Sequence, residues 1–373
     1  MIRDVALSLV TRVMLIAAGL ITSILTARAL GVAGRGEYFY IVTLAGLATQ
    51  FGNLGLASSN TYSLAKDHTL LPRLAANIFW ISLVGGVLSA CVILVFEAAR
   101  TKPHWFDGPV WMVILMVPTM LYGLLASNMF IGLSLIRQYN YFQLGSTMFQ
   151  LAAVAFAGWV AWGVGGFLWV SALTGLIAAG ALAVMLGRLH ALRWRFDWQL
   201  FRSQLGYASR AYLATLLGYA VSRAGVFLLD HFAGKAEIGI YSVALQFADV
   251  LIIVPATVAM VLFPDLLKGP AEKRFTQTMQ TTSQVALTMA ALCVVTGFVA
   301  FWIVPILFGE AFVLAVQVLW WMLPGVFALS LTNIISQYLA AQGIPPANVW
   351  TWFAGLVLLL VIGSYLIPRW GAL

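Results

Sequence analysis

The stretch ARALGVAGRGEYF, residues 27–39, interrupts a long apolar run with three glycines and two arginines. Its central letters, GVAGRG, have the spacing G-x-x-G-x-G, which is close to that of a phosphate-binding loop. Such a loop needs a β-strand before the glycines and the helix of a soluble domain after them. Here an apolar run of membrane-spanning length lies on each side. The stretch therefore predicts a tight outer turn between two membrane helices.

A second copy of this turn, GKAEIGIY at residues 234–241, aligns without gaps with GVAGRGEY at residues 31–38. Glycine is kept at two of the three glycine positions, and Glu237 replaces Gly34, which a turn between helices tolerates. Further pairs follow in the same order: Pro118 with Pro324, and AWGVGG at 161–166 with RWGAL at 369–373. The sequence thus predicts an internal duplication. An even number of predicted spans separates the copies, so both halves have the same orientation, as in parallel-repeat transporters.

The composition requires a membrane. Of the 373 residues 62% are hydrophobic and 9% are charged, whereas a soluble domain carries about 25% charged residues. Because one span needs about 20 apolar residues, we expect an all-α polytopic membrane protein with about eleven transmembrane helices in two lobes. The expected spans are 10–30, 37–64, 75–96, 110–135, 142–161 and 165–187 in the first lobe, and 205–229, 237–263, 284–308, 312–341 and 347–367 in the second.

The two lobes are expected at residues 1–187 and 205–373, with the sixth helix of the second lobe missing. The segment between them, RLHALRWRFDWQLFR at 188–202, alternates arginines with aromatic and aliphatic residues. This pattern predicts a basic amphipathic linker, 188–204, at the membrane surface, where it contacts anionic lipids. A second interpretation is that it guides an anionic lipid substrate into the protein.

Lysine and arginine lie mainly in the short loops on the side of the N-terminus. Basic loops stay in the cytoplasm, so we expect a cytoplasmic N-terminus. The formal net charge of +8 is then explained by the basic loops that orient the protein in the membrane. No nucleic-acid partner is expected.

Three segments resemble a known family. ARALGVAGRGEYFYIVTLAGLATQFGNLGLASS at 27–59 is similar to the first hairpin of the polysaccharide-biosynthesis flippases of the multidrug/oligosaccharidyl-lipid/polysaccharide exporter superfamily. AGKAEIGIYSVALQFADVLIIVPATVAMVLFPDL at 233–266 resembles the hairpin of their seventh and eighth helices, and LIPRWGAL at 366–373 resembles the segment before their last helices. The chain differs from the family at Gly225. Many family members carry an acidic residue at this place, two positions after an arginine of the seventh helix, which is Arg223 here.

The resemblance implies a fold and a cargo. It implies two lobes around a central cavity that opens alternately to each face of a bacterial inner membrane. The implied cargo is an undecaprenyl-diphosphate-linked oligosaccharide, flipped from the cytoplasmic to the periplasmic leaflet for surface polysaccharide synthesis. A polysaccharide polymerase and assembly proteins are the implied partners.

Ionisable residues within spans are costly and usually face a cavity or a partner. Arg223 lies in the middle of a span, so it is the first candidate to bind the diphosphate through its planar guanidinium. Arg210 and Arg12 are further candidates, and snorkelling to headgroups is the alternative for both. Asp249 and Asp230 are candidates to bind a coupling H⁺ or Na⁺, or to pair with Arg223.

Amide side chains within the spans are candidate contacts for sugar hydroxyls, and hydrogen bonds between helices are the alternative for each of them. The amide residues are Gln50, Asn53, Asn60, Asn128, Asn333 and Gln337. Beyond a coupling ion, no metal or cofactor is expected.

Two other functions have less support in the sequence. A multidrug or cation antiporter of the same superfamily would favour acidic cavity groups, and the arginines within the spans argue against it. A membrane-embedded polysaccharide polymerase or ligase would need a catalytic group beside a large outer loop. The four histidines are widely spaced and no H-E-x-x-H, C-x-x-C or G-K-[ST] motif occurs, so the sequence predicts no enzyme.

Overall fold

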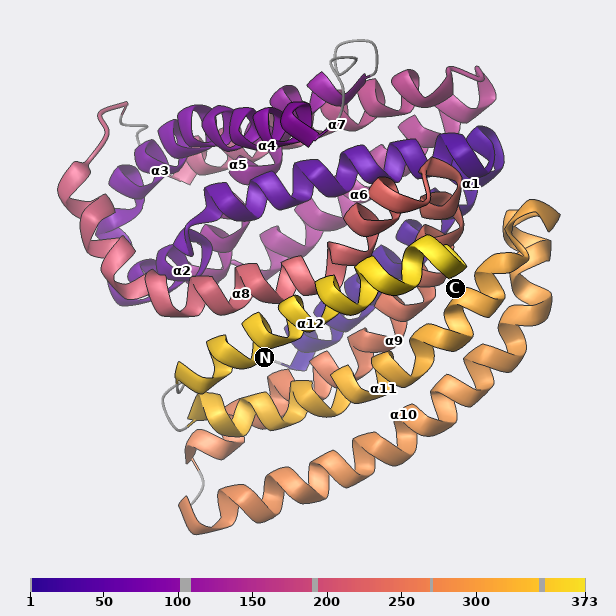
Figure 1. Ribbon diagram of the computed structural model, residues 1–373. Coiled ribbons are helices and arrows are strands. Elements are labelled where there is room, and N and C mark those ends of the chain that lie inside the picture. The colour runs from indigo at the N-terminus through magenta and orange to yellow at the C-terminus, as the bar shows by residue number, and fades with distance from the viewer. Residues whose placement is uncertain (1, 101–108, 190–193, 269–270, 342–345, 373) are drawn as a thin grey trace. The chain divides into compact units, whose positions relative to one another are not determined.

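The computed structural model describes residues 2–100, 109–189, 194–268, 271–341 and 346–372. These residues form helices and connecting turns without any β-strand, which confirms the all-α prediction (Figure 1). The α-helices are α1 (Ile2–Asn53), α2 (Leu56–Lys66), α3 (Leu71–Trp80), α4 (Gly86–Arg100), α5 (Val113–Gly132), α6 (Ile136–Trp159), α7 (Gly163–Leu189), α8 (Trp198–Phe232), α9 (Lys235–Lys268), α10 (Ala271–Phe308), α11 (Leu314–Ala341) and α12 (Pro346–Trp370). A π-helix, η2 (Ile81–Gly85), joins α3 to α4.

Nine helices in the described part of the chain are long and apolar enough to cross a membrane. The expected number was about eleven, and two features account for the difference. The first candidate span, Val10–Asn53, contains the expected first span and most of the second. The helix α6 is not among the nine, because polar side chains along it, among them Gln143 and Gln150, lower its mean hydropathy.

Glycines with positive φ occupy equivalent places in the two repeats. Gly31 breaks α1 with φ 66° and ψ −174°, and its equivalent Gly234 has φ 94°. Gly163 and Gly371 also pair in the repeat, with φ 66° and 67°. Only glycine adopts this backbone conformation without steric cost. These matching turns bear out the duplication predicted from the sequence.

Packing divides the chain into two compact units. The first contains Met1–Ala29 and Tyr40–Ala220, and the second contains Leu30–Phe39 and Val221–Leu373. The division differs from the repeat-based lobes in two ways: the first part of α8 belongs to the first unit, and the turn 30–39 belongs to the second.

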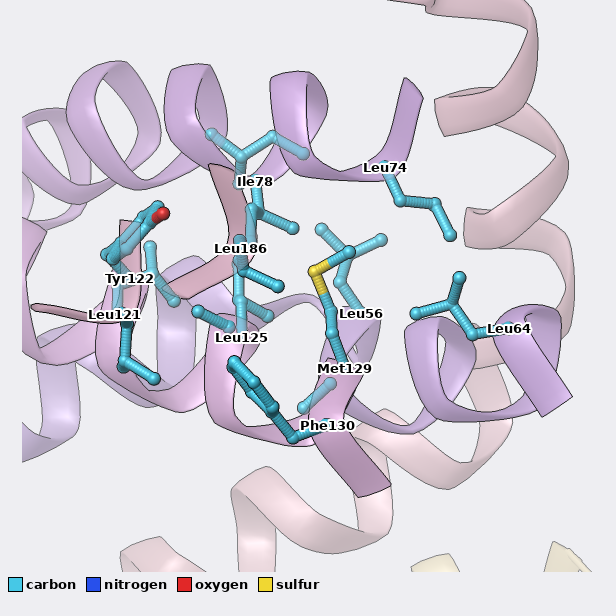
Figure 2. Packing of buried hydrophobic residues seen from close by; sticks show 14 of the residues in the cluster. Leu56, Leu64, Leu74, Ile78, Leu121, Tyr122, Leu125, Met129, Phe130 and Leu186 are labelled. Carbon is cyan, nitrogen blue, oxygen red and sulfur yellow. The ribbon is translucent and has the colours of Figure 1, made fainter. Parts of the chain in front are cut away.

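In the first unit, α5 is the central helix, with α2, α4 and α7 packed against it. Leu121, Leu125 and Phe130 of α5 are fully buried against α2, α3 and α7 (Figure 2). The helix α8 is tied to α2 by a hydrogen bond from Gln204 Nε2 to Asn60 Oδ1, 2.7 Å. The bilayer gives no hydrophobic driving force between helices, so tight packing and such polar bonds hold this unit together.

In the second unit, α11 packs along α9 and α10. Leu251 and Leu266 of α9, Met289 of α10 and Ile334 of α11 form its buried core. By contrast, α12 leaves most of its apolar side chains exposed, as a lipid-facing helix does.

The two copies of the glycine turn meet inside the second unit. A Cβ atom on Gly36 would overlap the carbonyl oxygen of Lys235 and lie 2.8 Å from the amide nitrogen of Gly239. A Cβ on Gly239 would overlap the carbonyl oxygen of Val32. Gly36 matches Gly239 in the repeat and Val32 matches Lys235, so the contact is reciprocal. Gly36 therefore permits a backbone contact, whereas Gly31 makes the turn.

Arg35 lies within the stretch predicted as an outer turn, and its side chain is buried, with 3% of its surface exposed. Its Nε donates a hydrogen bond to Ser242 Oγ, 2.8 Å, and its guanidinium lies 5.8 Å from the ring centre of Phe308. The turn 30–39 is thereby joined to α9 and α10 of the second unit.

Candidate functional site

The first candidate, Arg223, forms an ion pair within the second unit. Its Nη2 lies 2.9 Å from Asp249 Oδ2, which joins α8 to α9. The Arg223 side chain is 22% exposed and that of Asp249 is 43% exposed. A charge inside a span is stabilised by such a partner. The structure thus brings two of the predicted residues together.

Tyr241 lies beside this pair and interacts electrostatically with both charged groups. Gly225 makes room for it, because a Cβ at residue 225 would lie 2.7 Å from the Tyr241 hydroxyl oxygen. Any side chain at this position would displace Tyr241. The acidic residue that the family resemblance places there is absent, and Asp249 balances Arg223 from the neighbouring helix.

The other charged candidates lie apart from this pair. Arg12 is half-buried on α1. Arg210 belongs to α8, and its side chain is outside the described residues. Asp230, at the end of α8, forms an ion pair with Lys235 at the start of α9. Of the two candidate carboxylates, Asp249 is therefore the one that pairs with an arginine within a span, Arg223.

Asn53 and Asn128 bond to backbone groups four residues away in the chain. Asn53 Oδ1 accepts from the Ala57 amide at 3.1 Å, and Asn128 Nδ2 donates to the Leu124 carbonyl at 2.9 Å. Gln50 is half-buried on α1. Asn60 forms the hydrogen bond to Gln204 described above, which joins α2 to α8. Asn60 thus makes a hydrogen bond between helices, which was the alternative to a contact with sugar hydroxyls.

Asn333 and Gln337 lie one turn apart on α11. Their amide nitrogens donate to the carbonyls of Leu329 and Asn333, at 3.2 and 3.3 Å. Among the described residues, their side-chain oxygens have no hydrogen-bond donor. These two acceptors therefore stay candidates to bind sugar hydroxyls.

The structure also shows a polar clamp that the sequence did not predict. Three α3 side chains on one helix face, at positions i, i+4 and i+7, bind the segment 194–197. Arg73 pairs with the Asp197 carboxylate, its Nε lying 2.6 Å from Oδ2. Asn77 bonds both the amide and the carbonyl of Asp197, at 2.7 and 3.0 Å. Trp80 Nε1 donates to the carbonyl of Trp194 at 2.7 Å.

The predicted linker, residues 188–204, is not a separate element, because its last residues belong to α8. Residues 194–197 are not helical, and α8 begins directly after them at Trp198. Asp197 Oδ1 accepts a hydrogen bond from the Leu200 amide at 2.9 Å and so caps α8. The spacing of Arg73, Asn77 and Trp80 was visible in the sequence, but nothing there indicated their partner.

The clamp should depend on pH through Asp197. The hydrogen bond from the Leu200 amide, and then that from Arg73, lower the pKa of the Asp197 carboxyl. A carboxyl whose pKa is lower in the folded protein than in the unfolded chain stabilises the fold at any pH above its unfolded-state pKa, about 3.9. This stabilisation is lost as the pH falls through the lower pKa of the folded state. We expect Asp197→Asn to lower the Tm at pH 6, and the difference from wild type to close below about pH 4. Thermal unfolding in detergent measures it, and an undiminished difference at pH 3 would contradict the role of the charge.

Comparison with known proteins adds a family and a fold. Residues 2–269 match the model of the family described as polysaccharide biosynthesis protein. No curated protein matches the chain.

Several solved structures are similar to the chain at low sequence identity. An inward-facing multidrug resistance MATE family transporter of the MOP superfamily has a TM-score of 0.69 and 13% identity, over 95% of this chain and 87% of that one. An outward-facing MATE family transporter gives 0.58 and 13%, over 97% and 94%. A MOP superfamily transporter from Pyrococcus furiosus gives 0.57 and 14%, over 97% and 94%. These likenesses show the transporter fold.

Proposed function

We propose, from the premise that this chain belongs to the polysaccharide biosynthesis protein family, that it flips a lipid-linked oligosaccharide across a bacterial inner membrane. The chain is a multi-pass membrane transporter of the multidrug/oligosaccharidyl-lipid/polysaccharide exporter superfamily. The proposed cargo is an undecaprenyl-diphosphate-linked oligosaccharide, moved from the cytoplasmic to the periplasmic leaflet by alternating access. The cytoplasmic N-terminus, a coupling ion, and polymerase and assembly partners belong to the same proposal.

The observation that carries the proposal is the Arg223–Asp249 pair in the membrane-spanning part of α8 and α9. Arginine keeps its charge and presents a planar fork of donors that fits phosphate oxygens. Both side chains of the pair remain partly exposed, at 22% and 43%. An incoming diphosphate can therefore reach Arg223 and take the place of Asp249.

This exchange offers a way to couple transport to an ion. While Asp249 is ionised, it competes with the diphosphate for the same guanidinium. Uptake of H⁺ or Na⁺ by Asp249 would remove that competition, and its release would restore the ion pair and expel the cargo. Asn333 and Gln337 would contribute acceptors for sugar hydroxyls.

The rival cargo is an organic cation. The multidrug transporters of similar fold favour it by analogy, but fold alone does not set cargo. The similar Pyrococcus furiosus transporter is described as having a binding pocket of reversed polarity that suggests a different function. An arginine within a span favours an anionic cargo here.

Replacement of Arg223 tests the proposal. In a strain whose surface polysaccharide depends on this protein, we expect Arg223→Gln to lower polysaccharide at least about tenfold, because a charge-assisted hydrogen bond contributes about 1.5–3 kcal/mol. Arg223→Lys should retain part of the activity. The control is Lys273→Gln, since Lys273 is exposed on α10 and lies outside the proposed site.

A double variant separates cargo binding from structure. If Arg223 only balances Asp249, the double variant Arg223→Gln with Asp249→Asn should produce as much polysaccharide as Asp249→Asn alone. If Arg223 binds the diphosphate, the double variant should produce less polysaccharide than Asp249→Asn. Equal production by the two variants, or resistance to cationic drugs conferred by the wild type, would overturn the proposed cargo.

A further inference from the structure

The first unit contains an apolar cavity of about 680 Å³ beside the polar clamp. It is lined by Phe51 of α1, by Trp80, Val84 and Leu88 of α3, η2 and α4, and by Phe201 of α8. The π-helix η2 forms part of its wall, and π-helical turns in α-helices often occur at functional sites. Its volume lies in the range of small-molecule sites, about 300–1,000 Å³.

A second cavity, of about 590 Å³, adjoins the first. It is lined by Arg73, Asp197 and residues 194–196, and it shares Phe196 and Trp198 with the apolar cavity. The two together form one hollow with an apolar interior and a polar mouth. We call it the linker hollow.

The mouth of the linker hollow has one positive charge in excess. Arg73 is balanced by Asp197 in the clamp. Arg195 is exposed, and no residue in the described part of the chain forms an ion pair or hydrogen bond with it. A single negative charge would complete the mouth.

The tryptophans around the hollow place it at the level of lipid headgroups. Trp80, Trp194 and Trp198 are 37%, 64% and 65% exposed. Exposed tryptophans concentrate at the membrane–water interface, where their rings contact both hydrocarbon and polar groups. An occupant of the hollow would thus have its polar part in the interface and its apolar part in the bilayer.

We propose that the linker hollow is a binding site for an anionic membrane phospholipid. Its phosphate binds Arg195 at the mouth, and one acyl chain lies in the apolar cavity along Trp80, Val84 and Leu88. Basic pockets at the ends of membrane helices bind anionic headgroups in this way. A phosphodiester matches the one unbalanced charge, whereas the transported diphosphate would bring more negative charge than the mouth neutralises.

Such a lipid would contact both partners of the clamp. Its phosphate would hold the segment 194–197 through Arg195, and its chain would pack on α3 and η2. It would thus stabilise the junction where α8 begins. This role is independent of the transported cargo.

Native mass spectrometry of the full chain in detergent tests the proposal, with phosphatidylglycerol and phosphatidylcholine as probes. We expect one phosphatidylglycerol molecule to be retained in preference to phosphatidylcholine. Arg195→Gln should reduce this occupancy about tenfold, as loss of one charge-assisted contact does. Leu88→Trp, which fills part of the apolar cavity, should reduce it as well, and Lys273→Gln, exposed on α10, is the matched control outside the hollow.

Three outcomes would overturn the proposal: equal retention of the two lipids, occupancy unchanged in Arg195→Gln, or displacement of the lipid by millimolar inorganic phosphate. The last would mean that the mouth binds a free anion without the chain. Thermal unfolding checks that each variant is folded, and Val84→Phe replaces Leu88→Trp if the latter is not. Polysaccharide production in the Arg223 variants is a separate measurement, so either proposal can fail alone.

Discussion

A methyl group added at Gly36 or at Gly239 is expected to lower the free energy of unfolding by about 3 kcal/mol, because overpacking forces backbone and side chains apart. The new Cβ at residue 36 would overlap the Lys235 carbonyl oxygen, and that at residue 239 would overlap the Val32 carbonyl oxygen. These neighbours are backbone atoms at helix starts, so no side chain can turn away. Two helices would have to separate to relieve the overlap.

Unfolding of Gly36→Ala and Gly239→Ala in detergent micelles measures this effect. The matched control is Gly325→Ala on α11, where a Cβ would meet nothing within 4 Å. Alanine favours a helix over glycine by about 1 kcal/mol, so the control should be neutral or stabilising. Surface substitutions usually change the free energy of unfolding by less than about 0.5 kcal/mol. If the free energies of unfolding of the three variants differ by no more than this, the two turns are not in close contact.

The second large effect is expected at Arg35. We expect Arg35→Ala to lower the free energy of unfolding by about 3 kcal/mol, the cost of emptying a large buried volume. The side chain is 3% exposed, bonds Ser242 Oγ at 2.8 Å and lies 5.8 Å from the Phe308 ring centre. Its loss would leave a cavity between the turn 30–39 and the helices α9 and α10.

Arg35→Met separates volume from charge. Methionine fills similar space without a charge, and replacing buried ionic groups by apolar ones of similar volume is often neutral. If packing dominates, Arg35→Met should be clearly more stable than Arg35→Ala. Equal losses in the two variants would show that the guanidinium hydrogen bonds carry the effect.

Much of the fold follows from the sequence because a bilayer imposes simple constraints. Every backbone polar group must be bonded within its own span, so apolar runs of sufficient length predict helices. The turn 27–39 and its copy at 234–241 predicted a duplication, and the φ angles of Gly31 and Gly234 confirm it. The predicted spans 10–30 and 37–64 both begin within the single element α1, because Gly31 turns the chain between two helices without a separating loop.

The candidate site was predictable in part. Arg223 and Asp249 were both selected because charges within spans are costly, and pairing was one of the alternatives for them. The sequence leaves the partner of Arg223 open, since either Asp230 or Asp249 could pair with it. In the structure Asp230 forms an ion pair with Lys235, and Asp249 forms an ion pair with Arg223.

The helical class, the duplication and the costly charges within spans are predictable from the sequence, because each depends on local composition or on repeated residues. Tertiary structure decided what those residues contact. Gly36 and Gly239 are ordinary turn glycines until the two copies pack backbone to backbone. Arg73, Asn77 and Trp80 become a clamp only when α3 meets the segment 194–197. Contacts between residues more than a hundred positions apart depend on how helices pack, and side-chain order along one helix does not encode that choice.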